Sequence, residues 1–115
     1  MDNSTELQDL QKQKETLQDA IKLGEDLASL KMLPQWERVI GFYTKNMLDQ
    51  ALRNSSSTSL PPAMRDDSMF IVRSIGYFLN FLDLVQSNAE SARNQLPEVD
   101  NLMREAENNE WAKRN

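Results

Sequence analysis

The chain has 115 residues, of which 39% are hydrophobic and 27% are charged, and this composition suits one small helical domain. It contains no Cys and no His, which excludes a disulfide framework and a thiol nucleophile and removes the side chain that most often performs acid–base catalysis near neutral pH. The net charge of −5 disfavours a nucleic-acid-binding protein.

The first predicted helix covers residues 5–33. Its apolar and small residues follow one stripe with alternating spacings of three and four: Leu7, Leu10, Leu17, Ile21, Gly24 and Ala28. Lys14 interrupts this stripe, and Leu10 is the one apolar residue between positions 8 and 16. Residues 5–22 are therefore expected to form a thin, coiled-coil-like arm. The arm is interpreted either as a frayed helix or as a helix that pairs with another copy or a partner.

Pro34 ends the first helix or opens the second, since proline is favoured at a first helical position. An amphipathic helix is predicted over residues 35–53 because its apolar residues recur at helical spacing. These residues are Trp36, Val39, Ile40, Tyr43, Met47, Leu48, Ala51 and Leu52. Residues 54–59 are all Asn, Ser or Thr and are expected to form a solvated loop.

The third predicted helix begins near Ala63 or Asp67 and ends at Gln95, before Pro97. Twelve of its 17 residues from 69 to 85 are apolar. At about 100° per residue, one face is predicted to carry Ile71, Ile75, Phe78, Leu82, Val85 and Ala89. A second apolar group lies beside this face and consists of Phe70, Tyr77, Phe81 and Leu84. The remaining polar stripe is Gly76, Asn80, Asp83 and Ser87.

This apolar arc is wider than the stripe of about 100° that an ordinary surface helix buries. Either the first two helices wrap the arc within one chain, or a second copy or another protein covers Phe70, Tyr77, Phe81 and Leu84. Because a small domain buries a modest share of its surface, we favour a homo-oligomer. A membrane span is not expected, since the 17-residue stretch contains Arg73 and Asp83.

Residues 98–115 are predicted to form an acidic tail that is a short helix or partly disordered, after a single helical domain over residues 1–97. Trp111 lies in this tail and is a candidate anchor for a partner. The fold class is therefore all-α, with three main helices, two of them long and antiparallel. Gly24, Gly41 and Gly76 interrupt apolar helical patterns, where close approach of two helices is the usual compensation for glycine.

The sequence predicts a non-enzymatic protein. It carries no Gly-rich phosphate loop and no metal-ligand cluster beyond ordinary acids, and the serines at 55–57 and 59 have no His to activate them. We therefore expect no catalytic residue, no cofactor, no metal and no small-molecule substrate. The first residues show neither a basic region nor an apolar core typical of a signal peptide, which indicates a cytoplasmic protein.

Two segments carry a family resemblance. They are the run from Leu33 to Ile40 together with Tyr43, and the run from Arg73 to Leu82 together with Ala89 and Ala92. In these segments the chain resembles small helical proteins of tailed bacteriophages whose genes lie near those of virion head components. The resemblance implies a part in virion assembly or in the virion itself, with a location in the host cytoplasm and in the particle.

Two alternative functions stay open. One is a host-takeover factor that binds a host protein and uses its acidic ends as a partial mimic of nucleic-acid charge. The other is a single-stranded nucleic-acid-binding regulator that stacks bases on Trp and Tyr, which the acidic net charge disfavours.

Overall fold

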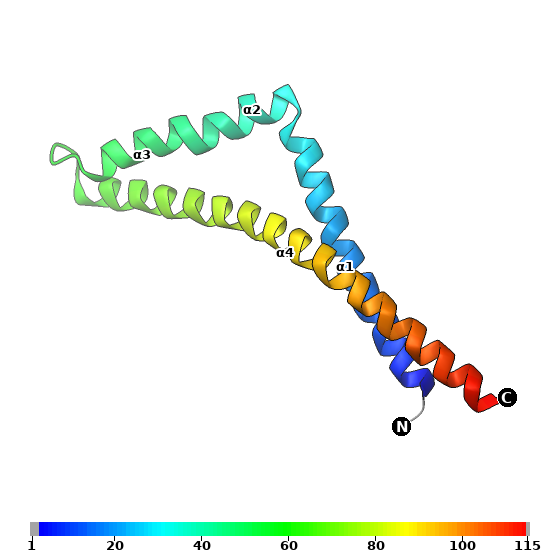
Figure 1. Ribbon diagram of the computed structural model, residues 1–115. Coiled ribbons are helices and arrows are strands. Elements are labelled where there is room, and N and C mark those ends of the chain that lie inside the picture. The colour runs from blue at the N-terminus through cyan, green and yellow to red at the C-terminus, as the bar shows by residue number, and fades with distance from the viewer. Residues whose placement is uncertain (1–2, 115) are drawn as a thin grey trace. The chain divides into compact units, whose positions relative to one another are not determined.

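The computed structural model describes the backbone of residues 3–114 and the side chains of residues 5–113. Within this range the chain is helical and contains no strand, which confirms the predicted all-α class (Figure 1). The elements are α1 (Asn3–Lys31), α2 (Pro34–Gly41), the π-helix η1 (Phe42–Met47), α3 (Leu48–Ser55) and α4 (Pro62–Arg114). Because α2, η1 and α3 follow one another without a break, the described residues form three helical segments.

The chain divides into two compact units. The terminal unit contains α1 up to Asp26 and α4 from Val85 onward. The central unit is Leu27–Leu84, which includes the end of α1, the segment from α2 to α3, and the first part of α4. The boundary between the units thus falls inside both long helices.

In the terminal unit, α1 lies against α4 through small side chains and one ion pair. A Cβ added to Gly24 would overlap the Cβ of Ala89, so the predicted close approach at Gly24 is confirmed. Ten residues earlier, the ammonium of Lys14 lies 2.8 Å from a carboxylate oxygen of Asp100. The buried side chains of α4 in this unit are Val85, Ala89, Ala92, Val99 and Ala106. Their separations of four, three and seven residues are those of a coiled-coil seam.

Pro97 does not end the helix, so the predicted boundary at Gln95 is wrong. α4 continues through Pro97 to Arg114. Proline removes one backbone hydrogen bond and crowds the preceding turn. The seam nevertheless continues past it, with Val99 and Ala106 each less than 5% exposed. Burial of these side chains against α1 offsets the local cost of proline, and a tertiary contact therefore overrides a sequence signal for a helix end.

The central unit packs the segment from α2 to α3 against the first part of α4 (Figure 1). The rings of Tyr43 and Phe78 meet edge to face with their centroids 5.8 Å apart. Ile75 is fully buried, and Leu82 and Ala51 are also buried. The burial of Ile75 and Leu82 confirms the predicted core face of the third helix. The other two members of this face in the central unit, Ile71 and Phe78, are half-buried.

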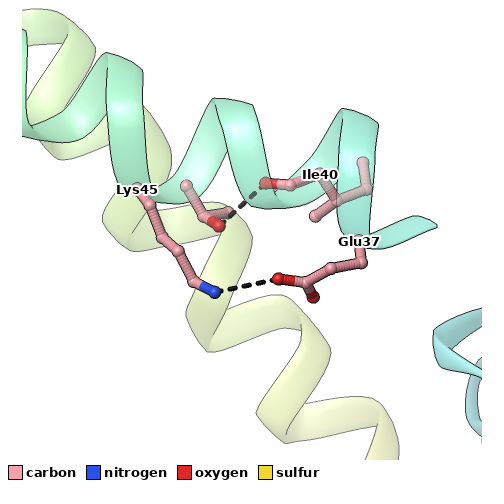
Figure 2. A network of polar contacts seen from close by, with 4 residues as sticks. Glu37, Ile40 and Lys45 are labelled. Atoms are coloured by element: carbon pink, nitrogen blue, oxygen red, sulfur yellow. Dashed lines mark hydrogen bonds and ion pairs between the residues drawn. The ribbon is translucent and has the colours of Figure 1, made fainter. Parts of the chain in front are cut away.

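The π-helix η1 was not predicted from the sequence, and two of its side chains make polar contacts with α2 (Figure 2). The hydroxyl of Thr44 donates to the carbonyl oxygen of Ile40 at 2.8 Å. That carbonyl would accept the N–H of Thr44 in a regular α-helix. Glu37 and Lys45 form an ion pair of 3.0 Å although they are eight residues apart.

The three glycines have different surroundings. A Cβ on Gly41 would lie 3.2 Å from the carboxylate of Glu37, so the missing side chain gives room to its own helix and not to a second one. A Cβ on Gly76 would meet nothing within 4 Å. The prediction that close helix approach explains all three glycines is therefore wrong for Gly41 and Gly76 within this chain.

The Gly24→Ala substitution is expected to lower the thermal midpoint of unfolding. Overpacking at a tight contact costs about 1–3 kcal/mol, whereas alanine gains roughly 1 kcal/mol over glycine in a helix. Gly76→Ala is the matched control and is expected to raise the midpoint, since its methyl group enters open space. Circular dichroism melting of both variants checks this, and equal midpoints would contradict the Gly24–Ala89 contact.

The Pro97→Ala substitution is expected to stabilise the chain, because proline in a helix interior costs up to about 3 kcal/mol relative to alanine. Urea unfolding followed by circular dichroism measures the gain. Pro62→Ala is the control and should change little, since Pro62 occupies the first residue of α4, where no intrahelical N–H bond is lost. A destabilised Pro97→Ala variant would show that α4 does not continue through residue 97.

Candidate interaction surface

Four large apolar side chains of α4 are exposed along one line of the central unit. Phe70 is 70% exposed, Tyr77 72%, Phe81 54% and Leu84 57%. They are separated by seven, four and three residues, and we call them the aromatic strip. The first two helices therefore do not wrap this surface within the chain, and one of the two alternatives that the sequence left open is removed.

The aromatic strip is separate from the buried seam of α4. At 100° per residue, its centre lies roughly 110° around the helix from the line through Ile75, Leu82 and Val85. With aromatic side chains of about 200 Å² each, the strip exposes about 500 Å². This area is at the upper end of the largest apolar patch on a typical monomer, and patches of that size commonly mark interaction sites.

One charged residue, Arg73, flanks the strip on its polar side, about 50° around the helix from the centre of the strip. Arg73 is exposed and forms no ion pair within residues 5–113. Ser74 interrupts the apolar line between Phe70 and Tyr77, and its hydroxyl donates to the carbonyl oxygen of Phe70 at 2.9 Å. Because that hydroxyl already has an acceptor, Ser74 can be covered by an apolar partner at low cost.

The leucine stripe of the predicted arm faces a partner inside the same chain. Leu7, Leu10 and Leu17 are half-buried and share the stripe of α1 that carries Lys14 and Gly24. Lys14 and Gly24 contact Asp100 and Ala89 of α4. The arm thus pairs with α4 in this structure, and a further role of the leucines in contacts between chains stays a prediction.

Trp111, the candidate anchor in the predicted tail, is 69% exposed on α4. The candidate interface residues of α4 therefore fall into two groups. The aromatic strip belongs to the central unit, and Trp111 belongs to the terminal unit.

The apolar part of α4 also passes a test for membrane-spanning helices. One stretch of at least 18 residues in the described chain is apolar enough, by length and composition, to cross a membrane. The core helix of a soluble protein passes the same test, and 22% of this stretch is buried in the chain. The expectation that the stretch does not span a membrane stays a prediction.

The described residues contain no group of three or more acidic side chains that could hold a metal ion. Comparison with protein families, with curated proteins and with solved structures finds no match to this chain. The resemblance to small tailed-phage proteins therefore remains a prediction from the sequence.

The sequence predicts the members of the strip, because they recur at helical spacing. It gives no sign of the ion pair between Lys14 and Asp100, since these two residues are 86 positions apart in the sequence.

Proposed function

We propose that this chain is a non-enzymatic protein that acts through protein–protein contacts and self-associates through the aromatic strip of α4. The single observation that carries the proposal is the exposure of Phe70, Tyr77, Phe81 and Leu84, each more than half accessible to solvent. Covering such side chains contributes about 25 cal/mol per Å² of apolar surface. A protein surface that presents complementary apolar side chains is the cover that best fits a narrow, regularly spaced line on one helix.

The proposed biological role is virion assembly or a minor structural part of a phage particle, in the host cytoplasm and in the virion. Its support is the resemblance of residues 33–43 and 73–92 to small helical tailed-phage proteins, together with an exposed surface suited to protein contacts. A host protein as the partner is the alternative. The acidic net charge of −5 supports neither nucleic-acid binding nor attraction to anionic lipids.

We further propose that α1 and α4 are a long antiparallel pair. The support comes from two contacts in the terminal unit. Lys14 meets Asp100, and Gly24 meets Ala89, so contacts move backward along α4 as they move forward along α1. α4 continues through residues 98–113, the segment that the sequence predicts to be an acidic tail with a short helix or partial disorder.

Phe81→Asp is expected to convert the associated protein into a smaller, folded species, because a charge would be buried without a partner in the interface. Light scattering coupled to size exclusion measures the mass, and circular dichroism checks the fold. Ser87→Asp is the matched control, since it adds the same charge to an exposed position of α4 outside the strip. Wild-type protein that stays monomeric at about 100 µM, a concentration that reveals weak interfaces, would overturn the proposal.

The virion role predicts that the chain co-purifies with capsid or portal protein from intact particles. Mass spectrometry of gradient-purified virions tests this, with the Phe81→Asp phage as the matched comparison. We expect the variant chain to be depleted from particles if the strip supplies the contact. Recovery of one host protein from infected cells, with no chain in the particles, would instead favour the host-takeover alternative.

A further inference from the structure

The aromatic strip extends into a second coiled-coil pattern once Ser74 is included. Positions 70, 74, 77, 81 and 84 alternate by four and three residues, the repeat by which two helices interlock side chains. The first seam of α4 is already used inside the chain, by buried residues such as Ile75 and Leu82. α4 thus carries two seams, one occupied and one open.

Resting on the self-association proposed above, we infer that the open seam takes a second copy of this chain, with the two α4 helices antiparallel about a twofold axis near residues 78–79. In this register Tyr77 lies beside the partner's Phe81, and the equivalent pair forms across the axis. Leu84 covers the partner's Ser74, so a large side chain meets a small one. Aromatic pairs of this kind add stability beyond their buried area.

The sizes of the side chains in the open seam select the antiparallel arrangement. In an antiparallel pair Ser74 meets the partner's Leu84, so a large side chain covers the small one. In a parallel pair Ser74 would instead face the partner's Ser74 and leave a gap in the interface, which costs stability.

The area of the strip sets the expected strength. Two strips of about 500 Å² bury about 1,000 Å² in total, which is the lower limit of specific protein interfaces. The dimer should therefore be weak and should dissociate on dilution. Because a twofold interface uses the same surface on both copies, it closes at the dimer and does not propagate into filaments.

Cross-linking of the full-length protein tests the orientation, because the chain contains no Cys and one introduced thiol is therefore unique. Ser74→Cys alone should not link to itself with a short bis-maleimide, since the two thiols would lie about 15 Å apart along the helices. An equal mixture of Ser74→Cys and Leu84→Cys should give the mixed dimer, which mass spectrometry identifies. Self-linking of Ser74→Cys would show a parallel pair and overturn the inference.

The outcomes separate this inference from the proposed function. Association that is lost in Phe81→Asp, together with self-linking of Ser74→Cys, leaves the proposed function standing and removes the antiparallel pair. Monomeric wild-type protein at about 100 µM removes both. Flotation of the wild-type chain with neutral phosphatidylcholine vesicles, reduced in Phe81→Asp, would assign the strip to a membrane surface and overturn the second copy as its occupant.

Discussion

The structure depends on one line of side chains along α4. Every buried residue of this helix, from Ser68 to Ala106, lies on a single seam with spacings of three, four or seven residues. The seam faces the segment from α2 to α3 in the central unit and α1 in the terminal unit. The size of the side chains along this seam differs between the two units.

The side chains do change in this way. In the central unit the seam carries Ile75, Phe78 and Leu82, and the ring of Phe78 meets that of Tyr43. In the terminal unit it carries Ala89 and Ala92, and Gly24 of α1 allows the two backbones to approach closely. In the central unit these large side chains supply apolar area. In the terminal unit α1 has few apolar side chains, and the small residues let the two helices pack closely. The ion pair between Lys14 and Asp100 then occupies a position where α1 lacks an apolar side chain.

A helix that uses one seam inside its own chain leaves the rest of its circumference to other partners. In α4 the remainder includes the aromatic strip, whose residues recur at regular helical spacing. This arrangement differs from exposed apolar residues scattered singly, which are normal on protein surfaces. The function proposed for this chain therefore follows from how much of α4 the chain itself can cover.

The sequence by itself determined the all-α class, the apolar face of the third helix and the membership of the strip, because helical periodicity is a local property that 18 residues suffice to show. The tertiary structure decided three other matters. It carried α4 through Pro97, since burial of Val99 and Ala106 outweighs one lost hydrogen bond. It joined Lys14 to Asp100, and it left Phe70 and Tyr77 uncovered. Each of these results depends on residues far apart in the chain, whose contacts no local pattern encodes.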